Sequence, residues 1–295
     1  MQSADFLSAV FFYLKVGENL NQNWIVENLN NAFSTWNGKL GELWGLVTTG
    51  PQTFKGGAVW SVMQTLHNGM VGIGYALVVL FFAISLCKNT MNFHELKRPE
   101  AAIHYFLRFV AAKALVGYGM DIMLNVFSIC NGIVTDMADS MGGISEAMVS
   151  LPAEMQTAIE NVGFLASIPL LRLTILVSLF ITVLSFVMIL TVYGRFFRLY
   201  MYTALAPLPL AAFAGESTQS VGISFLKSYV GVCLEGAVIV LACVIYSAFV
   251  STPTVTSGEA TTIVWSFLAE TVFNMLVLVG LIKGSDRIIH EMMGL

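Results

Sequence analysis

Residues able to do chemistry are rare inside the long apolar stretches of this sequence, and six polar residues stand out there. They are Lys113, Asp121, Asn125, Glu235, Glu270 and Asn274. A charge in the centre of a bilayer costs free energy, so such residues mark a partner, a subunit interface or a water-filled path. They either line a hydrated path or form hydrogen bonds and ion pairs between helices or subunits. Because polar contacts between membrane helices are common, we favour the second interpretation.

The strongest pattern among these residues is a polar stripe. Asp121, Asn125, Ser128 and Gly132 follow steps of four, three and four residues, which place them on one face of a helix. Lys113, eight residues before Asp121, lies within about 80° of it on a helical wheel, which gives the stripe a basic inner end and an acidic outer half. Elsewhere, Glu235 and Glu270 lie one or two turns inside the ends of their stretches, and Asn274 follows Glu270 by one turn.

Motifs for catalysis are absent from the sequence. It contains no HExxH, GxSxG or GxxxxGK[ST] pattern. The four histidines, at positions 67, 94, 104 and 290, do not share a metal-binding spacing on one helix. The four cysteines, at positions 87, 130, 233 and 243, form no CxxC pair and are interpreted as buried small apolar residues. The sequence therefore predicts no catalytic, cofactor or metal site.

The composition indicates the elements that position these residues. Of the 295 residues, 57% are hydrophobic and only 11% are charged, against roughly 25% charged residues in an average soluble protein. The mean hydropathy is +0.78. So few charges cannot cover the surface of a soluble enzyme, and so many apolar residues exclude a disordered chain. The chain is predicted to be an all-α, multi-pass membrane protein.

Five stretches are long enough to cross a bilayer, which takes about 20 apolar residues. They cover approximately residues 66–87, 102–134, 173–193, 230–250 and 263–282. The predicted organisation is an extracytoplasmic N-terminal segment, 1–60, followed by a transmembrane domain, 61–295.

The N-terminal segment carries a helical pattern of its own. Apolar residues recur at three- and four-residue steps, namely Ile25, Leu29, Phe33, Trp36, Leu40, Leu43 and Val47. With Trp24, Trp44 and Trp60 also suited to the headgroup layer, the pattern predicts an amphipathic helix lying on the membrane. A helix packed on another subunit is the alternative.

A proline-broken segment separates the third and fourth stretches. Residues 199–215 are apolar but short, and Pro207 with Pro209 would break a helix in the middle. A polar turn follows, then an amphipathic piece that ends at Lys227. We expect residues 199–229 to form a re-entrant or interfacial helical hairpin, because irregular backbone at membrane depth needs cover from protein or water.

Basic residues predict the orientation. Loop 88–100, the end of the third stretch, the hairpin and the C-terminus all carry Lys or Arg, which favours the cytoplasmic side for all of them. The N-terminus, loop 135–167 and loop 251–262 then lie outside, and loop 135–167 contains five acidic residues and no Lys or Arg. The C-terminus is predicted to be cytoplasmic.

The order of elements from about Leu173 to Val250 carries a family resemblance. An apolar span ends in Arg195-x-x-Arg198, followed by Ala206-Pro207-Leu208, small residues, a Ser/Thr/Gly turn and residues 225–229, which open another span. This order resembles the TrbL-type polytopic inner-membrane subunit of type IV secretion systems, the conjugation apparatus of bacteria. The likeness is close over roughly the C-terminal 40% of the chain, whereas the N-terminal half agrees only in general plan.

The resemblance implies a non-enzymatic membrane subunit without cofactors. Such a subunit assembles with copies of itself, with other secretion subunits and beside transport ATPases, and it helps DNA or protein to cross the bacterial cytoplasmic membrane. Carried over by position, Arg195, Arg198 and Lys227 would lie at the inner mouth, meaning the cytoplasmic end of the transfer channel, where they would meet lipid phosphate or DNA in transit. The ordinary preference of basic residues for the cytoplasmic side also explains their positions.

Two other functions remain open from the sequence. A small-molecule or ion transporter would use the discontinuous helix at Pro207 and Pro209 as its binding site. Against it, the proline hairpin has no counterpart in the first half of the chain. A scaffold without a pore is the third possibility.

Overall fold

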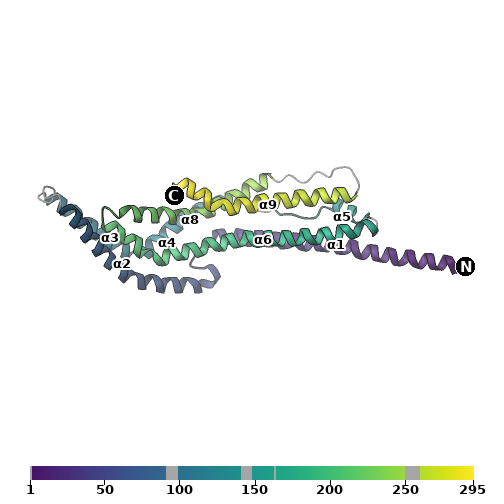
Figure 1. Cartoon of the computed structure of the whole chain (residues 1–295), viewed down its shortest axis with the longest axis horizontal. Coiled ribbons are helices and arrows are strands. Elements are labelled where there is room, and N and C mark those ends of the chain that lie inside the picture. The colour runs from purple at the N-terminus through teal and green to yellow at the C-terminus, as the bar shows by residue number, and fades with distance from the viewer. Residues whose placement is uncertain (1, 91–98, 141–147, 163, 250–259) are drawn as a thin grey trace. The chain divides into compact units, whose positions relative to one another are not determined.

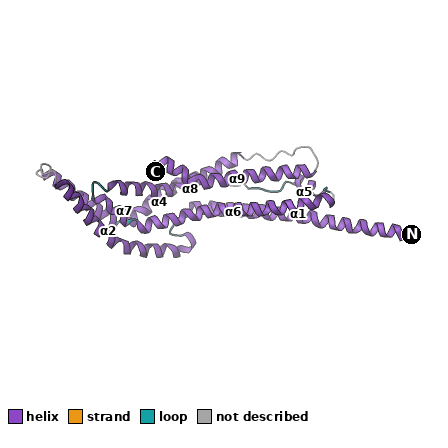
Figure 2. Cartoon of the chain, viewed as in Figure 1, coloured by secondary structure: helices purple, strands orange, loops and turns teal. Residues whose placement is uncertain are grey.

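The described residues of the computed structural model are 2–90, 99–140, 148–162, 164–249 and 260–295. Every regular element in these ranges is a helix (Figures 1 and 2). The chain folds into two compact units. The first comprises 1–44, 142–191 and 242–283, and the second comprises 45–141, 192–241 and 284–295. The predicted all-α fold is confirmed for the described residues.

The helices follow one another with short connections. In chain order they are α1 (Gln2–Thr48), the 3₁₀ turn η1 (Phe54–Gly57), α2 (Ala58–Thr90), α3 (Pro99–Gly117), α4 (Gly119–Ser140), α5 (Ala153–Glu160), α6 (Phe164–Leu205), α7 (Pro207–Ala211), η3 (Ala212–Ala214), α8 (Gln219–Phe249) and α9 (Ala260–Met293). Loops 88–100 and 251–262 of the predicted topology lie largely outside the described residues.

All five predicted membrane spans correspond to apolar helices. Four single helices qualify by length and composition, at Phe54–Lys88, Ser167–Leu205, Gln219–Phe249 and Thr261–Met293. The helices are longer than the spans that were predicted. The 42 residues of α6 extend about 63 Å at 1.5 Å per residue, roughly twice the thickness of a bilayer core. Such a helix either projects beyond the hydrocarbon layer or tilts strongly within it.

The second predicted span is not one straight helix. It consists of Ile103–Gly117 and Gly119–Asp139, which meet at an angle of 72°. Glycine on both sides of Tyr118 allows close packing at this bend: a Cβ atom on Gly117 would lie 2.7 Å from the hydroxyl of Tyr75, and one on Gly119 would lie 3.2 Å from Leu210. The helical-wheel relation between Lys113 and Asp121 was therefore wrong, because the two residues lie on different helices.

The amphipathic N-terminal pattern is confirmed as helical, but its surroundings were predicted wrongly. The apolar face of α1 is buried within this chain instead of lying on a membrane or on another subunit; its members are Ile25, Leu29, Phe33, Trp36, Leu40, Leu43 and Val47. In the first unit, Phe33 meets Phe267 of α9 edge-on, with ring centroids 6.5 Å apart. Trp36 is buried with this face and is not exposed to lipid headgroups or solvent.

The proline-broken segment has the predicted interruption but longer arms. The first arm is the end of α6, which stops at Leu205, and α7 begins at Pro207, where a missing N–H is tolerated. The second arm is the beginning of α8. In the second unit, α7 and η3 pack against α2 and α3, so protein covers one side of the irregular backbone, as non-helical backbone at membrane depth requires.

Candidate functional site: a buried charge cluster

Arg195 of α6 is the centre of a polar cluster in the second unit. Its side chain is fully buried, yet all three guanidinium nitrogens have acceptors. Nε donates to the carbonyl of Val232 at 3.2 Å, Nη2 to that of Cys233 at 3.1 Å and Nη1 to that of Val47 at 3.3 Å. A single side chain thus links α6 to α8 and to the last turn of α1, where helical carbonyls lack their own partners.

Close packing holds this guanidinium in place. Its central carbon lies 6.0 Å from the centre of the Phe127 ring of α4, within the range of a cation–π contact. On the α8 side, Gly236 provides the necessary space, because a Cβ atom there would lie 2.7 Å from Nη1 of Arg195. A phosphate group therefore cannot reach Arg195 in this conformation, contrary to the role expected for it at an inner mouth.

One turn further along α6, Arg198 forms the ionic part of the cluster. Its Nη2 donates to both carboxylate oxygens of Glu235 at 2.8 and 2.6 Å, and its Nη1 donates to Asp286 of α9. The carboxylate of Glu235 is completely buried and also accepts a hydrogen bond from Ser285 at 3.2 Å. Arg198 and Glu235 therefore find their partners inside this chain.

The turn after α1 docks onto the same part of α6. The hydroxyl of Tyr200 donates to the carbonyl of Pro51 at 2.8 Å, and the Phe54 ring stacks on Phe196 with centroids 4.0 Å apart. The left-handed backbone of Lys55, with φ of 50°, and of the two glycines that follow reverses the chain into α2. The α1–α2 turn is thus a fixed part of the cluster.

This docking constrains the predicted orientation. The sequence placed residues 1–60 outside and the Arg195 end of the third span in the cytoplasm, yet Val47 and Arg195 are hydrogen-bonded at 3.3 Å. A bilayer core about 30 Å thick cannot lie between two bonded groups. The two assignments therefore cannot both hold, and the α1–α2 turn lies at the same depth as Arg195.

His67 of α2 supports the helix break and was not singled out from the sequence. In a continuous helix the carbonyl of Thr203 would accept from the backbone N–H of residue 207, but proline has none. Instead, Nδ1 of the buried His67 ring lies 2.7 Å from this carbonyl. Because a carbonyl only accepts, Nδ1 carries the proton. The signal in the sequence was a histidine in an apolar span together with a proline that leaves a carbonyl without its donor.

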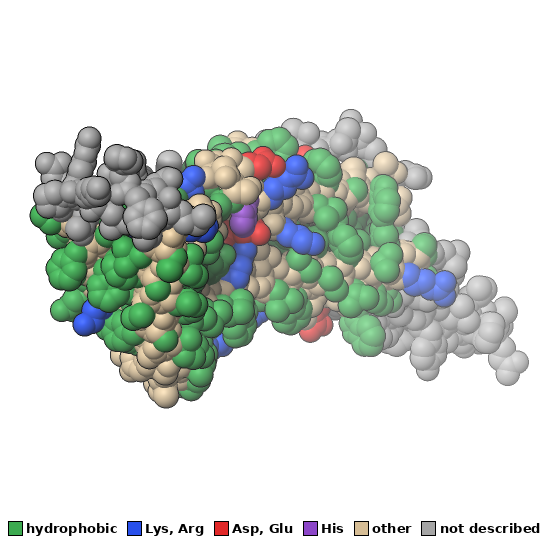
Figure 3. Space-filling view, turned by 60° about the vertical axis from the view of Figure 1, so that its left-hand side comes forward, with side chains coloured by type: hydrophobic (Ala, Val, Ile, Leu, Met, Phe, Trp, Pro, Cys, Tyr) green, Lys and Arg blue, Asp and Glu red, His purple; other side chains and the backbone are tan. Residues whose placement is uncertain are grey.

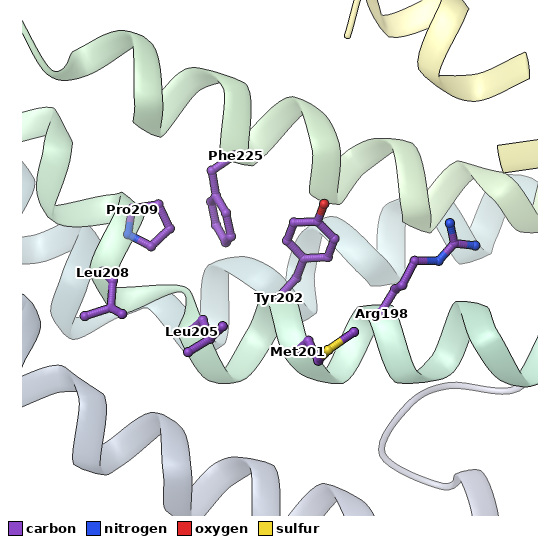
Figure 4. A pocket seen from close by; sticks show the side chains of 7 residues that line it. All are labelled: Arg198, Met201, Tyr202, Leu205, Leu208, Pro209 and Phe225. Carbon is purple, nitrogen blue, oxygen red and sulfur yellow. The ribbon is translucent and has the colours of Figure 1, made fainter. Parts of the chain in front are cut away.

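A groove runs along the second unit beside the break. Its volume is about 460 Å³, and Figure 4 shows Arg198 at one end, Leu208 and Pro209 at the other, and Tyr202 and Phe225 between them. Met201 and Leu205 complete a lining in which Arg198 is the only charged residue. The groove lacks the set of carbonyls or carboxylates that would bind an ion, so the discontinuous helix does not form a polar binding site here.

The remaining predicted residues are not brought together with the cluster. Lys113, Asp121 and Asn125 are exposed on α3 and α4 in the second unit. In the first unit Glu270 is exposed and Asn274 is buried. Lys227 of α8 is also exposed, and it has no ion pair in the described part of the chain. The other two basic residues assigned to the inner mouth differ from it, because Arg195 is buried and Arg198 is paired with Glu235.

The surface of the described residues agrees with a membrane environment. Many large apolar side chains are exposed, including Leu176 at 65%, Leu179 at 62% and Phe106 at 63%. Figure 3 shows that hydrophobic side chains occupy much of the described face. Cys130, Cys233 and Cys243 are buried as predicted, whereas Cys87 is exposed. No group of metal-ligating side chains occurs among the residues searched, which are those the structure describes.

Apolar helices of spanning length and a buried charge cluster define the class: this is a multi-pass helical membrane protein. The family model described as TrbL/VirB6 plasmid conjugal transfer like protein matches residues 36–207, more than half of the chain. The protein belongs to this family, whose members are components of conjugal transfer systems and not a known enzyme family. No curated protein and no solved structure matches the chain.

The matched range corrects the extent of the resemblance. It includes the third span and continues to Pro207, and this part contains the Arg195-x-x-Arg198 motif on which the resemblance was based. It also extends through the N-terminal half, where only a general likeness was expected. The second part of the pattern, residues 208–250, lies outside the match.

Proposed function

We propose that this protein is a channel or scaffold subunit of a conjugation apparatus, which helps DNA or protein cross the bacterial cytoplasmic membrane. The observation that carries this proposal is the family match over residues 36–207. The helical architecture supports it, with up to five candidate spans in the described residues. Five spans are too few to enclose a path for a polymer within one chain, so the proposal includes a homo-oligomer that works with other secretion subunits and transport ATPases.

The charge cluster has a structural role in this proposal. Arg195, Arg198 and Glu235 join α1, α6, α8 and α9 within the second unit, and Arg195 and Glu235 are fully buried. We propose that the cluster fixes the relative positions of these helices while cargo passes. Lys227 remains a candidate for contact with lipid phosphate or DNA, because its charge is accessible.

The membrane topology is also a proposal. We retain an N-terminus outside and a C-terminus in the cytoplasm, with the predicted spans within 61–295, and the side of the α1–α2 turn, which lies at the depth of Arg195, is the point to be tested. In a Cys87→Ser background, a Thr53→Cys variant labelled by an impermeant maleimide in right-side-out vesicles would place this turn at the outer face. Labelling only in inverted vesicles would place it at the inner face.

Contact with cargo tests the channel function. During active transfer, brief formaldehyde cross-linking and immunoprecipitation of the tagged chain should recover the transferred DNA strand above a control plasmid that lacks the transfer origin. If only protein is carried, a labelled protein substrate should be recovered instead. Recovery of neither cargo, while a transport ATPase in the same cells does recover it, would leave a scaffold without a pore.

The transporter alternative is weaker on structural grounds. The helix does break before Pro207, as a transporter site would require. However, the groove beside the break is lined by apolar residues apart from Arg198, whose charge is already paired with Glu235 and Asp286.

A further inference from the structure

The bend between α3 and α4 carries two charges that have no ion pair in the described part of the chain. Lys113 lies five residues before Tyr118 and Asp121 lies three residues after it, and both side chains are exposed. Both belong to the bent pair of helices that together pass as a span. A lone charge inside a membrane span is costly, so each charge calls for a partner or for water.

The surfaces that carry these charges are held in fixed orientations. The opposite face of α4 is buried, with Met123, Phe127 and Cys130 inside. The hydroxyl of Tyr229 donates to the carbonyl of Met123 at 2.8 Å, and Asn131 donates to the carbonyl of Thr48 at 3.1 Å. Rotating α4 to bury its polar stripe would break both bonds, so within the described part of the second unit the stripe stays exposed and available to a partner.

The stripe has the composition of a helix interface in a membrane. Asn125, Ser128 and Gly132 continue from Asp121 along α4, and all four are exposed. Small and polar residues let membrane helices approach closely and form hydrogen bonds between them. On α3, Lys113 shares an exposed face with Phe106 and Val110.

We propose that Lys113 of one copy pairs with Asp121 of the next copy, and that the α4 stripe is the subunit interface. In a ring, neighbouring copies are related by rotation about the membrane normal, which moves a residue around the ring without changing its depth. Lys113 and Asp121 lie within two turns of the same bend, so at 1.5 Å per residue their depths differ by at most about 12 Å. The opposite charges supply the complementarity that this heterologous contact needs. This inference rests on the homo-oligomer of the proposed function.

A charge swap tests the pair directly. Lys113→Asp and Asp121→Lys should each lower the oligomeric fraction in native membranes about tenfold or more, as expected for loss of one partner of a desolvated pair. The double variant should restore it. Lys113→Arg and Asp121→Glu are the matched controls that keep both charges. Single reversals that leave the oligomer unchanged would overturn the proposal, and so would folded single variants that the double variant does not rescue.

Cross-linking tests the geometry independently of stability. In a Cys87→Ser background, differently tagged chains carrying Lys113→Cys and Asp121→Cys should form a disulfide-linked heterodimer. Ile133 is exposed on α4 but lies about 120° around the helix from Asp121, so Ile133→Cys paired with Lys113→Cys should not cross-link. Equal yields from both pairs would contradict the interface.

Water at the stripe is the competing outcome. Ser128→Cys should be protected from a hydrophilic thiosulfonate in the assembled oligomer, and ready modification there would show a hydrated path and overturn the proposal. If the charge swap behaves as predicted but deletion of the chain leaves conjugal transfer intact, the interface is retained and the proposed function is wrong. If the deletion abolishes transfer but the charge swap has no effect on the oligomer, the function is retained and the interface lies elsewhere.

Discussion

Replacing the buried carboxylate of Glu235 by an amide should destabilise the protein strongly. Glu235→Gln retains the size of the side chain and an acceptor for Ser285, so it removes mainly the charge. Glu235 is completely buried and its partner Arg198 is 28% exposed. Breaking a buried pair from one side costs about 3–5 kcal/mol, and the partial exposure of Arg198 places our expectation near 3 kcal/mol.

The matched control is the second carboxylate of the same arginine. Asp286 also pairs with Arg198 but is 43% exposed, so Asp286→Asn should cost about 0–1 kcal/mol. The measurement is the free energy of unfolding in mixed micelles at increasing SDS, followed by tryptophan fluorescence. Removing both charges of the buried pair, with Arg198→Met and Glu235→Leu together, should cost less than Glu235→Gln alone, because the arginine that loses its buried carboxylate is removed as well. Asp286 also loses Arg198 in this variant, but it is 43% exposed and water can solvate it.

Two results would refute this reasoning. If Glu235→Gln and Asp286→Asn lost the same free energy within about 0.5 kcal/mol, burial of the carboxylate would have no energetic consequence. If the losses from Arg198→Met and Glu235→Leu simply added in the double variant, the two side chains would not be coupled. Either outcome would remove the cluster as the feature that holds the four helices together.

Two further predictions concern backbone positions near the cluster. Gly236→Ala should cost about 1–3 kcal/mol in the same unfolding assay, because its methyl group would displace Arg195. The control is Gly194→Ala, where nothing lies within 4 Å of the added methyl group, and it should be neutral or stabilise the protein by up to about 1 kcal/mol. Similar losses for both variants would contradict the packing of Arg195 against Gly236. His67→Leu should cost about 1–3 kcal/mol by leaving a buried carbonyl without a donor. This loss should shrink when Pro207→Ala restores a backbone N–H, and an equal loss in both backgrounds would show that the histidine does not replace the missing donor.

The sequence predicted those features that depend on local composition. The five spans follow from runs of apolar residues, and the break follows from Pro207, which lacks an N–H and cannot continue the helix. The partner of Glu235 was expected to be protein because a buried charge is costly. These conclusions need no knowledge of which helices are neighbours.

The features that the sequence did not predict depend on packing between distant segments. Counting basic residues assigned Arg195 to the cytoplasmic surface of the membrane. In the structure its side chain is buried in the second unit, where carbonyls of α1 and α8 accept its hydrogen bonds. The helical pattern around Trp36 showed an apolar face but not that this chain would bury it. The Gly117-Tyr118-Gly119 sequence permits a bend, but the 72° angle and the close approach of Tyr75 and Leu210 to its glycines are known only from the structure.

Conjugal transfer frequency tests the central claim most directly. An in-frame deletion of this chain in a host that carries the complete transfer region should reduce transfer to the level of a strain lacking the transport ATPase. Expression of the chain from a second plasmid should restore transfer, and a Glu235→Gln variant present at normal membrane levels should restore it only in part. Unchanged transfer in the deletion strain would contradict the assignment of this protein to the transfer apparatus.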